Sequence, residues 1–448
     1  MTQEPQSGDT DERPATYREV FTTRDVAALF GSYTVSKASS MLGRVAVTFL
    51  VFEATSSPLL SAAAFGISYA PYLGPAQLLA ALADRLPYRT TMVVSDLLRM
   101  VLIGLIALPG MPLPVMLILL FASAMVEPAY ESSRSALLPK LVSGEVLTLA
   151  LSVYLTLNQA AQLSGYFLGG AIAAVDPRVA LIVNSAGFAV SGLMLLTLVR
   201  HRPPDTTNAP RKNLVRESAE GFSLVFRHRI LRMIALVVFV TMTFTIIPEG
   251  AAAAWSDHLG GGALLQGTIM AAAPLAAIVS SVVMTRFLRA RVREQLIKPL
   301  VLLGPLVLVP ALWDPPGPVV VLIAVGCNLA MAPLAPMNAA FVKTVPDGYR
   351  ARAFSVMQSG MALIQGAAVV AMGALAQAME IHRSVGVWGV CGLLVVAGLL
   401  WWWPSRTEFN AAENNKTAEV KPVPPPESAP RPVPAPEAGE AASESAAG

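Results

Sequence analysis

Ionisable side chains inside long apolar segments are the residues of this sequence that could do chemistry. Lys37 and Arg44 lie in the apolar segment 26–52, where Tyr33 and Ser40 recur with them at helical spacing and share their face. A charge inside a membrane span costs about 2.5–3.5 kcal/mol, so it normally faces a partner or a water-filled cavity. This face is predicted to bind an anionic substrate or to pair with a carboxylate of the other half of the chain. A structural ion pair between helices, with Arg44 extended toward the surface, is the alternative.

Three glutamates in apolar segments are candidates for carrying protons. Glu127 and Glu131 are one helical turn apart, with Pro128 kinking the helix between them, and Glu127 is the deeper. We predict proton coupling at Glu127 and an ion pair at the membrane rim for Glu131. Glu249 follows Pro248 in a later segment, where apolar surroundings favour an uncharged carboxyl group. It is a second candidate proton carrier, and the alternative is an interfacial glutamate open to the outer water.

Uncharged polar residues also occur midway along apolar segments. Their side chains hydrogen-bond either a ligand or a neighbouring helix, and helix packing is the commoner use. The candidate substrate contacts of this kind, with helix packing as the alternative, are Asn158, Gln162, Asn328 and Gln365.

The composition is that of a membrane protein. Of the 448 residues, 54% are hydrophobic and 14% are charged, whereas soluble domains carry about 25% charged residues. A helix needs about 20 mostly apolar residues to cross the hydrocarbon core of a bilayer. We predict an all-α membrane protein with twelve transmembrane helices. They cover residues 26–52, 59–82, 91–108, 113–133, 147–174, 179–199, 233–254, 264–285, 299–313, 318–340, 354–379 and 385–403.

The basic residues predict the topology, because loops rich in Lys and Arg stay in the cytoplasm. Of the 32 Lys and Arg residues, 27 fall in the tails and in connections that the predicted helices place on one side. Arg178 and Arg383 fall on the other side, and the remaining three lie within spans. We therefore predict a multi-pass protein of the inner (plasma) membrane with both termini in the cytoplasm.

The predicted helices form two halves. The sequence Arg-Ser-Ala-Leu-Leu-Pro at 134–139 is echoed by Phe-Val-Lys-Thr-Val-Pro at 341–346. Two parallel six-helix repeats predict two pseudo-symmetric bundles with a site between them.

Apolar residues at near-helical spacing between Leu214 and Phe226 predict an amphipathic helix in the connection. The predicted divisions are an N-terminal tail 1–25, a first bundle 26–199, a linker 200–232, a second bundle 233–403 and a disordered tail 404–448 rich in Pro, Ala and Glu.

Motifs of other protein classes are missing from the sequence. It contains no His-Glu-x-x-His zinc motif, no Gly-x-Ser-x-Gly nucleophile elbow and no glycine-rich phosphate loop. Cys327 and Cys391 lie in apolar runs without metal-binding spacing, and the four histidines fall in loops or at helix ends. We therefore expect no enzyme, no ATP-driven pump, no metal, no nucleic-acid partner and no cofactor other than a proton gradient.

The connection between the second and third predicted helices resembles a known signature. Residues 80–89, Ala-Ala-Leu-Ala-Asp-Arg-Leu-Pro-Tyr-Arg, are similar to the signature loop of the major facilitator superfamily, Gly-x-Leu-Ala-Asp-Arg-x-Gly-Arg-Arg. Asp84, Arg85 and Arg89 stand at its charged positions, whereas two glycines and one arginine are replaced. The resemblance implies the major facilitator fold, and it implies that these three residues latch the two halves in the outward-facing state.

Other segments resemble the enterobactin-exporter and macrolide-efflux branch of that family, namely 96–99, 136–142, 220–228 and 345–352. Residues 161–170 are similar to the antiporter motif Gly-x-x-x-Gly-Pro-x-x-Gly-Gly, with Ala161 and Tyr166 as departures. This resemblance implies export coupled to proton entry. Besides the signature loop, we assign the conformational gate to Asp96, Arg99, Glu131, Arg134, Gly165, Gly169 and Gly170.

The leading hypothesis is a monomeric drug:proton antiporter of the multidrug-resistance kind. It would export a small organic molecule, such as a drug, a siderophore or a secondary metabolite, by alternating access in the lipid bilayer. Uptake by proton symport on the same fold is the alternative. A third possibility is a membrane sensor or scaffold that transports nothing.

Overall fold

The computed structural model describes residues 16–73, 86–201, 214–346 and 349–403, which are helical with short connections and contain no strand. Ten helical stretches among them are long and apolar enough to cross a membrane. Two further segments occupy the positions of the second and third predicted spans. The second span is described as far as residue 73, and the third is a helix of 19 residues. The total of twelve spans therefore stays a prediction.

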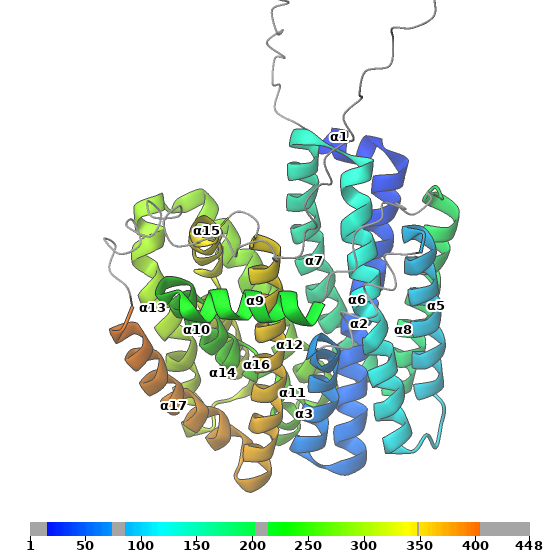
Figure 1. Cartoon of the computed structure of the whole chain (residues 1–448). Helices are drawn as coiled ribbons and strands as arrows, with labels where there is room; N and C mark the ends of the chain where they lie inside the picture. Colours follow the sequence, from blue (N-terminus) through cyan, green and yellow to red (C-terminus); the bar gives the residue numbers. More distant parts are fainter. Residues whose placement is uncertain (1–15, 74–85, 202–213, 347–348, 404–448) are drawn as a thin grey trace, which may run out of the picture.

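The first half of the chain forms one helical bundle, drawn in blue to green-cyan in Figure 1. Short caps set some of its helix starts: the Ser57 hydroxyl accepts a hydrogen bond from the Leu60 N–H group, with Pro58 in the first turn. Asp176 and Pro177 start a later helix in the same way. The elements are α1 (Tyr17–Thr22), α2 (Arg24–Thr55), α3 (Pro58–Gly66), the 3₁₀ segment η1 (Ile67–Leu73), α5 (Tyr88–Ile106), α6 (Leu113–Leu141), α7 (Gly144–Ala173) and α8 (Pro177–Leu198).

The second half forms the other bundle, drawn in green to orange (Figure 1). Its elements are α10 (Arg229–Thr245), α11 (Ile247–His258), α12 (Gly262–Val282), the π-helical turn η2 (Val283–Phe287), α13 (Ala290–Leu308), the 3₁₀ segments η3 (Val309–Trp313) and η4 (Leu329–Met331), α14 (Gly317–Asn328), α15 (Leu334–Thr344), α16 (Arg350–Ala378) and α17 (Ile381–Trp401). The helix α2 begins and α17 ends toward the same side, which we call the terminal side; the opposite side is the far side.

Two predicted spans are interrupted helices, although each still lies within one candidate membrane crossing. The segment 233–254 is divided at Ile246 into α10 and α11, with Pro248 in the first turn of α11. The segment 318–340 is broken by η4, after which α15 starts behind Pro333. Proline lacks an N–H group and clashes with the preceding turn, so the helix restarts there. The predicted span 299–313 was too short, because α13 already begins at Ala290. Part of the preceding basic connection therefore belongs to this helix.

The two bundles contact each other near the far side. Gly170, near the end of α7, lies against α12, where a Cβ atom on Gly170 would come within 2.9 Å of the Gly267 Cα atom. Gly373 of α16 packs on the start of α3, where its Cβ atom would lie 3.0 Å from the Leu59 Cα atom. Such close approach requires residues without side chains. Glycines therefore allow the halves to meet at the end remote from the termini.

Hydrogen bonds reinforce this far-side contact. The Gln266 amide of α12 donates to the Val45 carbonyl oxygen (3.2 Å) and to the Thr48 hydroxyl oxygen (2.6 Å) of α2. At the rim, the Ser57 hydroxyl donates to the Gln377 Oε1 atom at 3.0 Å. The described contacts thus close the far side of the molecule between its halves.

The connection between the halves contains the helix α9 (Leu214–Arg227), which lies across α10 and α16 (Figure 1). Arg352 of α16 forms a 2.7 Å ion pair with Glu220. A Cβ atom on Gly221 would lie 2.8 Å from the Arg352 carbonyl oxygen, so the two helices touch backbone to backbone. Phe222 remains 56% exposed, whereas Val225 is buried. The helix is therefore amphipathic, and its contact with a membrane surface stays a prediction.

Replacing Gly170 by valine should separate the two bundles at the far side, because the added side chain collides with Gly267. We expect a Ser57→Cys/Gln377→Cys pair to be joined several-fold more slowly by a short bifunctional thiol reagent in the Gly170→Val chain than in its parent. Cross-linked protein would be quantified by mass spectrometry of peptides that contain both positions.

The experiment uses a background in which Cys327 and Cys391 are replaced by serine. Gly398→Val is the matched control, because nothing lies within 4 Å of the Cβ position of that helical glycine. Equal cross-linking rates in the Gly170→Val chain and its parent would contradict the proposed contact.

Candidate functional site

Glu127 lies at the centre of a group of three cations inside the first bundle. Its carboxylate is 3.1 Å from the Lys37 Nζ atom, 3.4 Å from an Arg99 guanidinium nitrogen and 3.9 Å from an Arg44 guanidinium nitrogen. The four side chains are between 4% and 17% exposed. Because so little water reaches these side chains, each charge needs an opposite charge nearby to offset the cost of its burial. We call these four residues the Glu127 cluster.

Three helices position the Glu127 cluster. Lys37 and Arg44 are seven residues apart on α2, so they project from nearly the same face two turns apart. Arg99 comes from α5, where its guanidinium group also lies over the Phe188 ring at 5.3 Å from the centroid. Glu127 comes from α6, directly before Pro128, which lies inside that helix. The predicted pairing of the α2 cations with a carboxylate of the other half is therefore wrong for Lys37, because its partner belongs to the same bundle.

A small polar cavity adjoins the cluster. Arg44, Arg99 and Glu127 line it together with Ser123 and Asn184, and its volume is about 40 Å³. A buried water requires about 10–15 Å³ measured in this way, so the cavity has room for water or for a small polar group. The Asn184 Oδ1 atom is buried and has no hydrogen-bond partner among the described residues. The cluster therefore borders a space that a water molecule or a ligand atom could enter to hydrogen-bond Asn184.

Glu249 forms a second charged point, at the junction between the halves. The Tyr166 hydroxyl of α7 donates a 3.0 Å hydrogen bond to the Glu249 Oε2 atom of α11. Arg44 lies near both and interacts electrostatically with Glu249, while its guanidinium group is 5.9 Å from the centroids of the Phe65 and Tyr69 rings. Arg44 therefore pairs with Glu127 of its own half at 3.9 Å and acts on Glu249 of the other half over a longer distance.

A third group lies toward the terminal side of the first bundle. Arg134 pairs with Glu131 at 3.0 Å, and its guanidinium group lies 3.7 Å from the centroid of the Tyr154 ring. The Tyr33 hydroxyl donates to the Asn158 Oδ1 atom at 2.7 Å and contacts the Tyr154 hydroxyl at 3.2 Å. Tyr33 therefore belongs to this aromatic group rather than to the Glu127 cluster, although it shares a helix face with Lys37.

Asp96 is fully buried between three helices. It accepts hydrogen bonds from the Ser36 hydroxyl of α2 at 2.9 Å and from the Ser191 hydroxyl of α8 at 2.6 Å. Arg89, at the start of α5, donates to the Leu196 carbonyl oxygen. Asp84 and Arg85 lie outside the described residues. Asp96 and Arg89 of the predicted gate thus tie helices within the first bundle, and the latch assigned to the signature loop stays a prediction.

The antiporter-motif glycines are divided between two contacts. A Cβ atom on Gly165 would collide with the Ala38 carbonyl oxygen, and one on Gly169 would lie 2.9 Å from the Leu42 Cα atom, both on α2. Gly170 instead faces the other bundle. The motif therefore serves packing within the first bundle and contact across the halves.

Three other predicted site residues lie outside these clusters. The Gln162 amide donates to the Gln159 Oε1 atom of its own helix at 3.0 Å. The Asn328 amide donates to the Ala324 carbonyl oxygen at 3.0 Å, and the Gln365 amide contacts the Met242 sulfur atom at 3.5 Å. Gln365 thus contacts a neighbouring helix, as in the helix-packing alternative, whereas the described hydrogen bonds of Gln162 and Asn328 stay within their own helices.

The sequence interpretation missed several participants. Tyr166 was noted as a departure from a motif, and its contact with Glu249 was not foreseen. Tyr69 and Gln266 were not singled out, although Gln266 is a fully buried amide in an apolar segment. That signal is the same one that selected the other four polar residues, and it could have identified Gln266.

Comparisons with known proteins agree with this architecture. A family model described as Major Facilitator Superfamily matches residues 29–342. A peptide transporter POT in complex with sulfate superposes with a TM-score of 0.67 at 14% identity, over 89% of this chain and 99% of that chain. A POT family transporter in complex with 5-aminolevulinic acid gives a TM-score of 0.66 at 15% identity, over 89% and 98%. The nucleoside transporter NupG gives 0.66 at 13% identity, over 84% and 100%. No curated protein sequence matches the chain.

Removing the carboxylate of Glu127 should destabilise the first bundle, because three cations then face one another without a counter-charge. We expect Glu127→Gln to lower the free energy of unfolding by about 3 kcal/mol, the lower end of the range for a broken buried ion pair, because the group borders a cavity. Adding Lys37→Met should restore part of this loss. Thermal unfolding of the purified protein in detergent measures both effects.

Glu53→Gln is the matched control, since Glu53 is exposed near the end of the same helix that carries Lys37. If Glu127→Gln unfolds at the same temperature as Glu53→Gln, the cluster does not contribute to stability as described.

Proposed function

Because the chain belongs to the major facilitator superfamily, we propose that it is a secondary active transporter that exports a small organic molecule in exchange for protons by alternating access. Membership makes the chain a membrane transport protein rather than an enzyme. The direction, the proton coupling and the class of substrate are the proposed part. The observation that carries the proposal is Arg44, which pairs with Glu127 of the first half and interacts electrostatically with Glu249 of the second.

The Glu127 cluster has more positive than negative charge. Three cations within 4 Å face one carboxylate. Such an excess of positive charge next to a polar cavity favours an anionic substrate or one with a carboxylate, phosphate or phenolate group. Lys37, Arg44 and Arg99 would bind that group, while Glu127 holds the cations in place when no substrate is bound.

Glu249 is the better placed of the two carboxylates for carrying the proton. Glu127 is surrounded by three cations, whereas Glu249 has the Tyr166 hydroxyl as its hydrogen-bond donor and one cation in electrostatic reach. Adding a proton to Glu249 removes its attraction for Arg44. Arg44 then interacts more strongly with Glu127 or with a bound anion, so protonation and substrate binding influence each other through one side chain.

This exchange of partners also concerns the contact between the halves. Arg44 and Tyr166 belong to the first bundle and Glu249 to the second, so the proton on Glu249 changes the free energy of the closed far side. A ligand shifts a conformational equilibrium by the difference in its affinity for the two states. Proton entry supplies about 2.3 kcal/mol per charge for each 100 mV of membrane potential, which is the driving force for export.

Two other functions are consistent with the same fold. Proton symport would use the same residues for uptake, and it differs in which combination of bound proton and substrate permits the halves to rock. In a sensor or scaffold, the same charged residues would only stabilise the fold, and no substrate would be transported. The efflux direction is supported by the sequence motifs at 96–99 and 161–170.

We place the terminal side in the cytoplasm of the inner (plasma) membrane, because the basic residues are concentrated on that side. We expect a reporter enzyme that is active in the cytoplasm to be active when fused after residue 403 and inactive when fused after Val175 or Asp314. The reporter that is active outside the membrane should show the reverse pattern. Activity of the same reporter at the C-terminus and at Val175 would contradict this orientation and the odd number of spans predicted between these two points.

Proton coupling can be tested in two stages. First, cells that lack the protein and cells that carry it are compared on a panel of anionic drugs, siderophores and secondary metabolites, which identifies a substrate. Everted vesicles carrying the protein should then accumulate that substrate and dissipate an imposed pH gradient. An uptake permease would instead release it under the same gradient.

The second stage assigns the coupling residue. We expect Glu249→Gln to retain exchange of labelled for unlabelled substrate, because no net proton movement is needed, and to lose accumulation driven by the pH gradient by at least tenfold. Tyr166→Phe should weaken coupling less, and Asp257→Asn, an exposed carboxylate on the same helix, is the control. Gradient-driven accumulation by Glu249→Gln at the level of the parent would exclude Glu249 as the proton carrier.

A further inference from the structure

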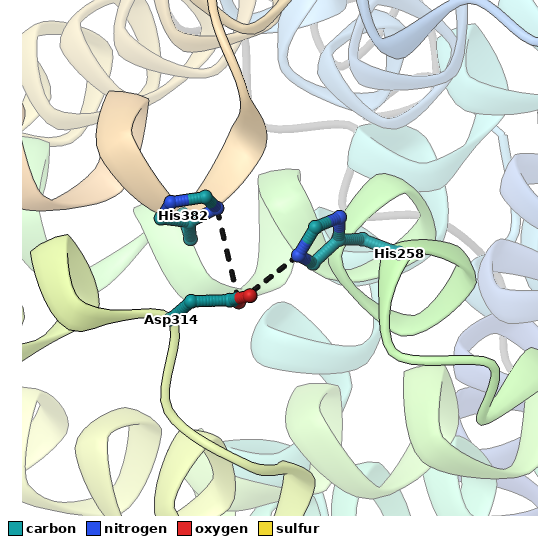
Figure 2. Close-up of side chains that lie close together, drawn as sticks. All are labelled: His258, Asp314 and His382. Atoms are coloured by element: carbon teal, nitrogen blue, oxygen red, sulfur yellow. Dashed lines mark hydrogen bonds and ion pairs between the residues drawn. The ribbon is translucent and has the colours of Figure 1, made fainter.

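Three side chains from distant parts of the second half converge on its far side. His258 is the last residue of α11, Asp314 follows η3, and His382 is the second residue of α17. Figure 2 shows the two imidazole rings on either side of the Asp314 carboxylate, each reached from a different segment. The His258 Nε2 atom is 2.9 Å and the His382 Nδ1 atom is 3.7 Å from the Asp314 Oδ1 atom. We call these three residues the His–Asp–His cluster.

The spacing of the ligand atoms is that of a metal site. Zn²⁺ binds imidazole nitrogen at about 2.0–2.1 Å and carboxylate oxygen at about 2.0–2.2 Å, so neighbouring ligands of a tetrahedral ion lie about 3.3 Å apart. The distances from the Asp314 Oδ1 atom to the two histidine nitrogens, 2.9 Å and 3.7 Å, fall on either side of that value. All three ligand atoms lie within 4.8 Å of one another, so the third pair has to close by at most about 1.5 Å.

His382 provides independent evidence for a ligand. Its residue is 6% exposed, and its Nδ1 atom is buried without a hydrogen-bond partner among the described residues. A buried imidazole nitrogen that points at a carboxylate 3.7 Å away is too distant for a hydrogen bond and leaves room for a bridging atom. An ion bound to both groups would satisfy it.

The opposite nitrogen of His382 has the partner that metal-bound histidines usually have. Its Nε2 atom lies 3.5 Å from the Glu380 Oε2 atom. Histidine ligands commonly direct their second ring nitrogen toward a carboxylate, which fixes the orientation of the ring and strengthens its binding to metal. Glu380 is in turn paired with Arg383 at 3.1 Å, which holds the carboxylate in this position.

Asp314 has an unusual backbone conformation. Its φ of 47° lies in the left-handed region, which non-glycine residues adopt rarely and for which Asp is one of the better-suited types. This conformation aims the carboxylate at both rings from the short connection between η3 and α14. The side chains of His258 and Asp314 are 34% and 47% exposed, so an ion can enter from the far side.

We propose that His258, Asp314 and His382 bind one divalent transition-metal ion of the Zn²⁺ type, with water in the fourth position. Two imidazoles and one carboxylate suit Zn²⁺ and its neighbours in the transition series, whereas Ca²⁺ and Mg²⁺ prefer oxygen ligands throughout. The ion joins α11, the η3–α14 connection and α17. It fixes the far ends of these helices to one another and thereby stabilises the second bundle. This differs from the expectation, drawn from the sequence alone, that the chain binds no metal.

Binding can be measured without any assay of transport, so the outcome is independent of the proposed function. The full chain is purified in detergent without a polyhistidine tag and is freed of metal with a chelator. We expect Zn²⁺ to raise its thermal unfolding temperature by several degrees, because a ligand of the folded state stabilises it by mass action, and Mg²⁺ or Ca²⁺ at the same concentration to leave it unchanged. Co²⁺ should bind with a stoichiometry of one and give the intense visible absorption of a tetrahedral site.

Three variants locate the site. His382→Ala and Asp314→Asn should each abolish the Zn²⁺-dependent shift and the Co²⁺ absorption. His258→Ala should have the same effect. Because it changes an exposed residue at a helix end, it tests the site even if the other two variants fold poorly. His201→Ala is the matched control, because His201 is an exposed histidine on the terminal side and should leave both signals intact. A Zn²⁺ shift that survives in all three cluster variants, or no shift in the parent, would overturn the proposal.

Discussion

The cost of placing ionised groups in an apolar interior governs the arrangement of this protein. Three cations in membrane-spanning helices, Lys37, Arg44 and Arg99, need a counter-charge. The carboxylate of Glu127 on α6 supplies it. The carboxylate ties α2 and α5 to α6 beside a small cavity. Because three cations face one carboxylate, Glu127 neutralises only part of their positive charge. The unbalanced charge is what a substrate or a second carboxylate can use.

The contacts between the halves are of a different kind. They combine glycines that allow backbones to touch, such as Gly170 and Gly267, with a few hydrogen bonds from Gln266 and Tyr166. Contacts between small residues depend on van der Waals packing of helices that approach closely. The close ion pairs of the Glu127 cluster lie within the first bundle, and the longer-range interaction of Arg44 with Glu249 crosses the halves.

The sequence predicted the identity of the charged residues better than their partners. Lys37 and Arg44 could be placed on one helix face from spacing alone, because helical periodicity is local and independent of neighbouring helices. Their common partner Glu127 was singled out as well, yet its pairing with Lys37 was not, because that depends on the rotation and depth of α6 relative to α2. Tyr166 illustrates the same limit. Its role appears once α7 and α11 are placed side by side, and no pattern within 161–170 encodes the position of Glu249.

The breaks in the second half explain how a far-side metal can be relevant to the central site. The helix α11 starts at Ile247, after the division at Ile246, and ends at His258, so it is a short rod between two bends. Glu249 and His258 lie nine residues apart on this rod, which corresponds to about 14 Å along the axis. A helix of this length does not stretch, so a constraint on the position of His258 is also a constraint on Glu249. An ion bound there as proposed would hold α11 against α17, and Glu249, the proposed proton carrier, would then move with the second bundle as one body.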